Sequence, residues 1–347
     1  SPKDMPTARN FVSGIIIKHN YLFELTKSAR NINLYGYITV LELPMKRIAK
    51  ITGISIIIII ILLAGAGWYF SGLVVNPNIK TYEETYTIEI AKGRIDKSQF
   101  ESLPFETVYI DSPHGYRLHA LYLAAANSKK TIIFTHGFSF SLLGSVKYME
   151  IFRRLGFNIL MYDHRHHGKS GGDNVTFGYR EADDLKAVVS WALTKLGGQG
   201  TIGIHGESIG AAVALQHASI DNRDAFYISD GSFTRLSELL KFRLRQDFGL
   251  PAFPLYHVAS LFSKIRAGYF FGDISPLESL QKATAPILFI HGGADTYIPT
   301  YMGKKLFESY ADRKRLYICP GAKHSESFWT NKEEYERQVR EFLKEVL

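Results

Sequence analysis

Short apolar runs alternate with helical patterns along residues 105–347. Several of these runs are bounded by Gly, Pro or Asp, as is typical of buried parallel strands. They predict strands at residues 105–110, 117–123, 131–135, 158–162, 201–205, 226–229, 287–291 and 316–319. Apolar positions at helical spacing predict helices at residues 143–155, 179–196, 209–219, 301–310 and 332–346. This alternation predicts an α/β fold with helices on both faces of a doubly wound sheet.

One stretch, residues 231–272, interrupts this alternation between two predicted strands. It is too long for an ordinary connection, it is rich in Phe and Tyr, and Pro251 and Pro254 interrupt it. We interpret it as a helical lid over the carboxyl edge of the sheet, with a cap that only packs on itself as the alternative. Phe248 and Phe253 are the residues that we expect to supply an apolar wall to a substrate pocket.

The longest apolar stretch lies near the N-terminus, where residues 51–79 carry no charge. About 20 apolar residues suffice to cross a bilayer, so residues 45–75 are predicted to form a signal anchor and residues 51–75 to contact the membrane. Lys46, Arg47 and Lys50 precede the stretch, which favours an N-terminal side in the cytoplasm and a following domain outside a bacterial cell membrane. Small residues at 64–66 also suit a cleaved signal peptide, which would give a secreted protein.

The segments on either side of this stretch carry less information. Residues 1–44 receive no function, and they are interpreted as an extension or leader before the "MKRIAK" that begins at Met45. Residues 76–104 are polar and mixed in character, and we expect them to form a linker to the domain at 105–347.

Charge and cysteine content exclude some classes of function. The net charge is +8, but residues 1–50 hold eight Lys or Arg residues and only three acidic ones, so the rest of the chain is near balance. A nucleic-acid surface is therefore not expected. Cys319 is the only cysteine, which excludes an intrachain disulfide and a cysteine-based zinc cluster.

A G-x-S-x-G pattern, "GESIG", lies where the strand at 201–205 turns into the helix at 209–219. In this context the pattern indicates a nucleophile elbow, in which Ser208 sits on a sharp turn and its small neighbours let strand and helix approach. The positive end of the helix points to the same place. A glycine-rich turn without chemistry is the alternative.

A serine hydroxyl needs a base, and the base needs an acid to orient it. Asp295 in "GGADTYIP" follows one predicted strand and His324 in "GAKHSES" follows the next. Both therefore fall at the sheet edge that holds Ser208. Asp230 in "ISDGS" also follows a strand and is the rival acid; a turn cap and a loop histidine are the structural alternatives.

Backbone N–H groups are expected to bind the developing oxyanion of an acyl-transfer reaction. One is that of Ile209, directly after the serine, and the other is assigned to Phe138 in "THGF". His136 is interpreted as a support for that loop.

Asp163, His164, His166 and His167 in "YDHRHHGKSGG" could be metal ligands by composition, but they crowd one tight loop without helical spacing. A loop that braces the catalytic edge is the preferred interpretation, and no metal is predicted.

These motifs together resemble those of the α/β-hydrolases. The "THGF" loop, "YDHRHHGKSGG", "GIHGESIG", "HGGADTYIP" and "GAKHS" occur in the family's order and spacing over residues 105–347. Within the family the chain is similar to bacterial membrane-anchored serine hydrolases with a short helical cap. The resemblance implies an eight-stranded, mostly parallel sheet and an acyl-enzyme mechanism without a cofactor. Serine at the elbow argues against the haloalkane dehalogenases, which use aspartate there.

The sequence thus predicts a serine carboxylic-ester hydrolase that acts on short to medium acyl esters through Ser208, Asp295 and His324. A thioesterase, a lipase or a peptidase would use the same residues. A non-catalytic ligand-binding member of the fold is the alternative from another class. The natural substrate and the oligomeric state stay undetermined by the sequence.

Overall fold

The computed structural model of the chain describes residues 34–347, with side chains from residue 44 onward. The chain divides into two compact units, residues 1–63 and residues 64–347. The second unit carries the whole sheet and all the motifs that resemble those of the α/β-hydrolases. Most of the N-terminal extension, for which no function is predicted, lies outside the described residues.

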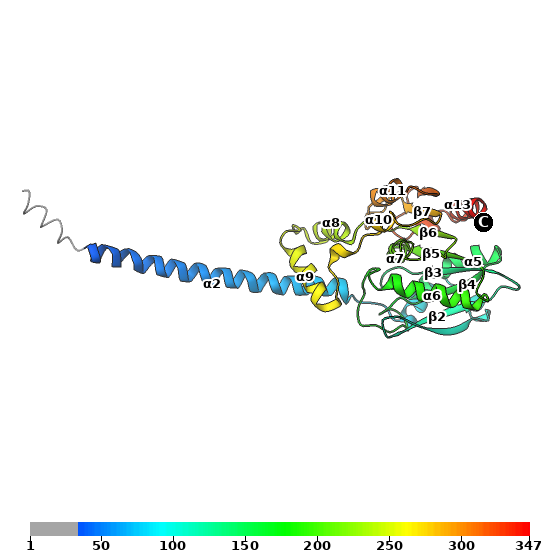
Figure 1. Ribbon diagram of the computed structural model, residues 1–347, viewed down its shortest axis with the longest axis horizontal. Helices are drawn as coiled ribbons and strands as arrows, with labels where there is room; N and C mark the ends of the chain where they lie inside the picture. The colour runs from blue at the N-terminus through cyan, green and yellow to red at the C-terminus, as the bar shows by residue number, and fades with distance from the viewer. Residues whose placement is uncertain (1–33) are drawn as a thin grey trace, which may run out of the picture. The chain divides into compact units, whose positions relative to one another are not determined.

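The sheet of the second unit has eight strands in the order β1-β2-β4-β3-β5-β6-β7-β8 (Figure 1). The strands are β1 (Glu106–Asp111), β2 (Arg117–Leu123), β3 (Lys130–Thr135), β4 (Asn158–Tyr162), β5 (Thr201–Glu207), β6 (Phe226–Asp230), β7 (Ile287–Gly292) and β8 (Lys314–Cys319). Strand β2 is antiparallel to both of its neighbours, and all pairs from β4 to β8 are parallel. The predicted eight-stranded, mostly parallel sheet of an α/β-hydrolase is confirmed.

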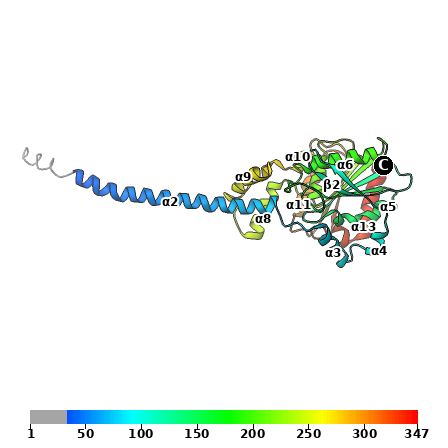
Figure 2. The ribbon, with the colours of Figure 1, turned by 90° about the horizontal axis from the view of Figure 1, so that it is seen from below.

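Helices cover both faces of this sheet, as predicted. One buried cluster joins the sheet to α6 (Glu181–Lys195), α7 (Ile209–His217) and α11 (Thr300–Ser309). The second cluster joins the other face to η1 (Leu142–Ser145), α5 (Val146–Arg154), α12 (Ser327–Thr330) and α13 (Lys332–Val346). Figure 2 shows α6 on one side of the sheet and α5 and α13 on the other.

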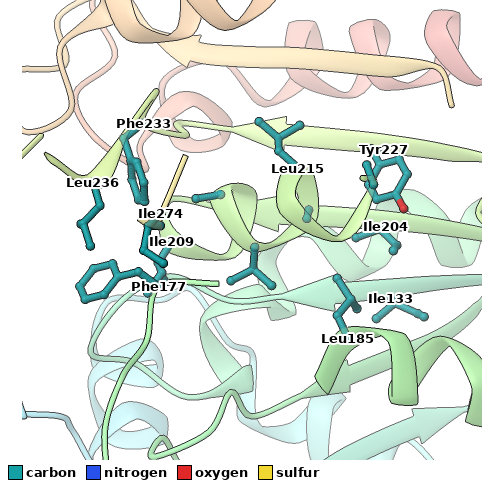
Figure 3. Close-up of a cluster of buried hydrophobic side chains, with 14 of the residues drawn as sticks. Ile133, Phe177, Leu185, Ile204, Ile209, Leu215, Tyr227, Phe233, Leu236 and Ile274 are labelled. Carbon is teal, nitrogen blue, oxygen red and sulfur yellow. The ribbon is translucent and has the colours of Figure 1, made fainter. Parts of the chain in front are cut away.

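Successive residues of the central strands are buried on opposite faces, which explains their unbroken apolar runs. In β3, Ile133 belongs to the first cluster, whereas Ile132 and Phe134 belong to the second. Figure 3 shows Ile133 with Ile204 of β5 in the first cluster. A strand that is buried on both faces needs apolar side chains at successive positions. It therefore lacks the alternation of apolar and polar residues that a half-exposed strand shows.

Residues 76–104 differ from the predicted linker. They form two helices, α3 (Tyr82–Ala91) and α4 (Lys97–Ser102), and Ile95 between them is buried in the second cluster. Tyr82, Tyr86 and Ile90 recur every four residues on α3 and pack against that cluster. Charged residues lie between these positions and make the mean composition of the segment polar. Composition alone therefore does not reveal that α3 packs against the domain.

The stretch between β6 and β7 is a helical insertion. It contains α8 (Leu236–Phe248), α9 (Leu255–Ala267) and η2 (Phe271–Asp273), and α10 (Pro276–Ser279) follows it. Gly249 and Gly268 end α8 and α9 in the left-handed conformation, which glycine adopts without steric cost. These glycine-capped ends set the two helices apart as separate pieces of the insertion.

The apolar N-terminal stretch is helical. It lies within α2 (Leu34–Val75), whose part from Pro44 to Val75 is long and apolar enough to cross a membrane. The last turns of α2, residues 64–75, belong to the second unit.

Candidate active site

Ser208 lies at the turn from β5 into α7, with φ +56° and ψ −117°. This left-handed region is rarely adopted by residues other than glycine, and such strain is typical of a nucleophile elbow. Side chains at the flanking glycines would clash with backbone: a Cβ on Gly206 would lie 2.4 Å from the Gly210 carbonyl oxygen, and one on Gly210 would lie 2.0 Å from that of Thr135. The two glycines therefore permit the turn on which the hydroxyl is presented.

The structure brings the three residues of the predicted triad together. The Ser208 hydroxyl lies 2.8 Å from Nε2 of His324, and Nδ1 of His324 lies 2.7 Å from Oδ2 of Asp295. Asp295 and His324 stand in the loops after β7 and β8, so the parallel strand ends bring them beside the end of β5. The arrangement suits proton transfer from the serine to the imidazole, with the carboxylate fixing the ring.

Asp295 is held firmly in its ionised form. Its Oδ1 accepts the backbone N–H groups of Tyr297 and Ile298, each at 2.9 Å. Burial opposes ionisation, but hydrogen bonds from His291 and His324 outweigh it, and the pKa of Asp295 lies well below its usual value. A carboxylate at this position therefore faces His324 across the physiological pH range.

His291 is a residue that sequence reasoning missed. It is buried at the end of β7, its Nε2–H donates to the Ile298 carbonyl at 2.8 Å, and the same nitrogen lies 3.4 Å from Oδ2 of Asp295. It thereby fixes the loop that carries the acid. Its place in "FIHGGAD", four residues before Asp295, is the signal that could have indicated it.

Asp230, the rival acid, is directed elsewhere. Its carboxylate accepts hydrogen bonds from Tyr335 at 3.1 Å, from Ser327 at 3.3 Å and from Tyr148 at 3.4 Å. Its backbone carbonyl accepts the Ser208 N–H at 2.8 Å. Burial and the nearby Glu207 raise its pKa to about 6. Asp230 therefore holds the backbone of Ser208 through its carbonyl group, and its carboxylate makes no hydrogen bond to His324.

Glu207 and Lys147 form a buried ion pair beside Ser208, which sequence reasoning also missed. The Glu207 carboxylate contacts the Lys147 ammonium and accepts a hydrogen bond from Tyr148. Burial raises its pKa, but the Lys147 charge outweighs this effect and the net shift is downward. The second residue of "GESIG" is thus a fixed negative charge next to Ser208, and its partner is the Lys147 ammonium on α5.

The two predicted oxyanion donors lie next to Ser208. The N–H groups of Phe138 and Ile209 have no hydrogen-bond partner within residues 34–347, so both can donate to a ligand. A Cβ on Gly137 would lie 3.8 Å from Cβ of Ser208 and 3.1 Å from Oε1 of Glu207, which shows how closely this loop approaches the elbow. Two unpaired donors beside a serine hydroxyl are the arrangement that acyl transfer needs.

Histidines hold the loop that carries Phe138. Nδ1–H of His136 donates to the Gly137 carbonyl at 2.8 Å, and Nε2 of His136 accepts the His164 N–H at 2.9 Å. Burial, followed by the neighbouring His164 and His167, lowers the pKa of His136 well below its usual value. His166 and His167 each face a backbone carbonyl, and Asp163 accepts the backbone N–H groups of Leu142 and Lys169. These contacts fit the preferred interpretation of a bracing loop.

Two cavities meet at Ser208, and both are also lined by Phe138 and Tyr297. The first measures about 290 Å³ and is mostly apolar, with walls from the helical insertion, although Arg243 and Asp247 also line it. The second, which we call the polar cavity, measures about 490 Å³ and has a more polar lining than the first; α3 and the loop after it contribute Glu89, Lys92 and Arg94 to that lining. Ser208 thus stands where an apolar and a polar chamber join.

The two expected wall residues differ in position. Phe248, at the end of α8, lines the apolar cavity. Phe253 does not: it lies in the loop between α8 and α9, its side chain is 76% exposed, and its ring meets that of His257 edge to face. Aromatic content indicated an apolar insertion, but it could not distinguish the inner from the outer surface of that insertion. Phe70, Leu73 and Val74, from the end of α2, line the cavity and were not expected there.

Comparisons with known proteins agree with this architecture. Residues 132–340 match the alpha/beta hydrolase family. The chain is 39% identical over 279 residues to YqkD of Bacillus subtilis, which covers 80% of this chain and 92% of that protein. It is 27% identical over 201 residues to the lysophosphatidylserine lipase ABHD12 of Danio rerio, covering 55% of this chain and 50% of that one.

Solved structures of similar fold also include hydrolases. The esterase Pf2001 of Pyrococcus furiosus superposes with a TM-score of 0.60 at 26% identity, covering 73% of this chain and 96% of the esterase. Esterase-like neighbours of this kind support a hydrolase. The family match extends over more than half of the sequence, and the chain belongs to the alpha/beta hydrolase family.

Proposed function

We propose that the protein is a serine carboxylic-ester hydrolase that works through an acyl-enzyme. The observation that carries this proposal is the hydrogen-bonded series from Ser208 through His324 to Asp295, next to the free N–H groups of Phe138 and Ile209. The names of two relatives, an esterase and a lysophosphatidylserine lipase, are consistent with ester substrates. A thioesterase or peptidase would use the same groups, but no feature of the site favours either.

The proposed reaction takes place in two steps. Ser208 Oγ attacks the carbonyl carbon while Nε2 of His324 takes the hydroxyl proton, and the two free N–H groups bind the resulting oxyanion. The ester C–O bond then breaks, and the imidazolium gives its proton to the leaving alcohol. Water adds to the acyl-enzyme with His324 again as the base. The Ser208–acyl bond breaks, the serine regains its proton, and the carboxylic acid leaves.

A fluorophosphonate tests this proposal directly, because it reacts with a serine that an adjacent base activates. The full chain should be labelled at Ser208, as located by peptide mass spectrometry, and should hydrolyse p-nitrophenyl butyrate. A protein that binds esters without labelling or turnover would instead be a non-catalytic member of the fold.

We expect short to medium acyl chains to be preferred. Each buried methylene contributes about 0.8 kcal/mol while the apolar cavity still has room, which is about a fourfold gain per carbon. On p-nitrophenyl esters kcat/KM should rise from acetate, reach its maximum between butyrate and decanoate, and then fall. A flat profile, or a maximum at palmitate, would contradict a short pocket.

Phe248 and Phe253 provide a matched pair of aromatic variants for this profile. Phe248→Ala removes a wall of the cavity and should flatten the profile more than it changes acetate hydrolysis. Phe253→Ala, outside the cavity, should leave the profile as it is. Equal effects of both variants would show that the insertion acts through its general stability.

We further propose that α2 anchors the protein in a bacterial cell membrane, with the hydrolase domain outside. The helical segment from Pro44 to Val75 is long and apolar enough to cross a membrane, and Lys46, Arg47 and Lys50 lie at its N-terminal end, which supports this orientation. Protease added to cells stripped of their wall should digest residues beyond about 76 and leave the tether embedded. A mature protein in the medium that begins at Gly67 would instead support a cleaved signal peptide.

A further inference from the structure

The last turns of α2 form part of the apolar cavity. Phe70, Leu73 and Val74 line it together with residues of α8 and α9. The Phe70 ring meets that of Phe248 edge to face, with centroids 5.0 Å apart. One wall of the chamber beside Ser208 is therefore the end of the apolar span itself.

Close packing fastens this end of α2 to α9. A Cβ on Gly67 would lie 2.5 Å from Cγ1 of Val258, so the absence of a side chain there permits the contact. Trp68 meets Phe262 edge to face, with centroids 5.6 Å apart. The Arg266 guanidinium donates to the Trp68 carbonyl at 3.0 Å and stacks over the Trp68 ring at 4.3 Å. Figures 1 and 2 show α8 and α9 beside this end of α2.

The outward face of α9 carries two apolar residues beside the exposed His257 and Lys264. Leu261 is 51% exposed and Ile265 is 66% exposed, although α9 buries another face in the domain and packs Val258 and Phe262 against α2. Exposed apolar groups of this kind are typical of surfaces that contact a membrane or a protein. Because α9 packs against the last turns of a helix that is long and apolar enough to cross a bilayer, the bilayer is the partner that this face would meet. Trp68 at this end suits the interfacial region.

We propose that the ester reaches Ser208 from the bilayer, and that its acyl chain lies between α8 and the last turn of α2. This inference rests on the proposed ester hydrolysis and on the proposed anchor. The substrate class is an amphiphilic ester dissolved in the membrane surface. Its acyl chain occupies the apolar cavity, and its polar alcohol portion occupies the polar cavity. The two cavities share Ser208, which places the ester bond at their junction.

The test uses the full chain in phosphatidylcholine vesicles with two fluorophosphonates, one with an ethyl chain and one with a decyl chain that ends in a diazirine. Both react with Ser208 if the proposed function holds. After illumination, the decyl probe should be attached to residues of the apolar cavity, among them Phe70, Leu73 or Val74. Attachment only to the polar cavity or to residues outside both cavities would overturn the proposal.

The ratio of decyl to ethyl labelling rates measures the chain site separately from the chemistry. Leu73→Trp fills the cavity and should lower this ratio by about tenfold or more. The matched control Leu62→Trp, on the same helix but not lining the cavity, should keep the wild-type ratio. An unchanged ratio in Leu73→Trp would overturn the inference, whereas loss of labelling by both probes in the wild type would overturn the proposed function.

The route from the bilayer is tested on the outward face of α9. The double variant Leu261→Glu and Ile265→Glu should lower the decyl-to-ethyl ratio about tenfold in vesicles, because charge keeps this face from the membrane. Ile220→Glu, an exposed apolar position in the loop after α7, is the control and should not change it. If the double variant keeps the wild-type ratio but converts a dimer into a monomer in detergent, the face binds a second copy and the bilayer route is wrong.

Discussion

Replacing Ser208 with alanine is expected to lower kcat for ester hydrolysis by roughly a millionfold, as loss of the nucleophile does in other serine hydrolases. The change removes the hydroxyl that forms the acyl-enzyme in the proposed mechanism but leaves the N–H groups of Phe138 and Ile209 in place. Alanine adds no bulk to the elbow, so the fold should be retained. Residual turnover should then reflect oxyanion binding alone. The measurement is p-nitrophenyl butyrate hydrolysis, with fluorophosphonate labelling of the same preparations.

A second buried serine provides the control for that experiment. Ser232 lies in the loop after β6, and its hydroxyl donates to the Phe233 carbonyl at 3.1 Å. Ser232→Ala should keep both labelling and turnover, because this hydroxyl makes no contact with His324. Labelling that survives in Ser208→Ala would show that another serine is the nucleophile.

The fold could be predicted because each buried strand needs a short run of apolar residues, which can be seen in the sequence. Strands such as β3 are buried on both faces, so their central residues are apolar in succession and can be recognised without knowing their neighbours. The helices of residues 76–104 were missed for the opposite reason. Tyr82, Tyr86 and Ile90 give α3 one apolar stripe, but Glu83, Glu84 and Glu89 make the segment polar on average.

The candidate site also has features that the sequence could predict and features that it could not. The placement of Ser208, Asp295 and His324 together follows from topology, because the carboxyl ends of parallel strands meet at one edge. The contacts that depend on packing between distant segments could not be predicted. The Lys147 partner of Glu207 comes from α5, and the cavity wall at Leu73 comes from the end of α2. Phe253 was placed wrongly because composition does not say which way a loop side chain faces.

Asp295→Asn is expected to lower kcat by about ten-thousandfold, the cost of the wrong imidazole tautomer. Oδ1 of Asp295 accepts the N–H groups of Tyr297 and Ile298, so the asparagine oxygen should keep that position. Its NH₂ group would then face Nδ1 of His324 and donate to it. The imidazole proton would move to Nε2, where it points at Ser208, and the ring could no longer accept the serine proton.

Asp230→Asn is the matched variant, since it makes the same change of one atom in a neighbouring buried carboxylate. Its partners are the hydroxyl groups of Tyr335, Ser327 and Tyr148, which can rotate to donate to or accept from an amide. Burial already raises the pKa of Asp230 to about 6, so a neutral side chain is close to what the site favours. We therefore expect kcat to fall far less than in Asp295→Asn. The reverse ranking would assign the acid to the end of β6, and His324 would then have to turn away from Asp295 during the reaction.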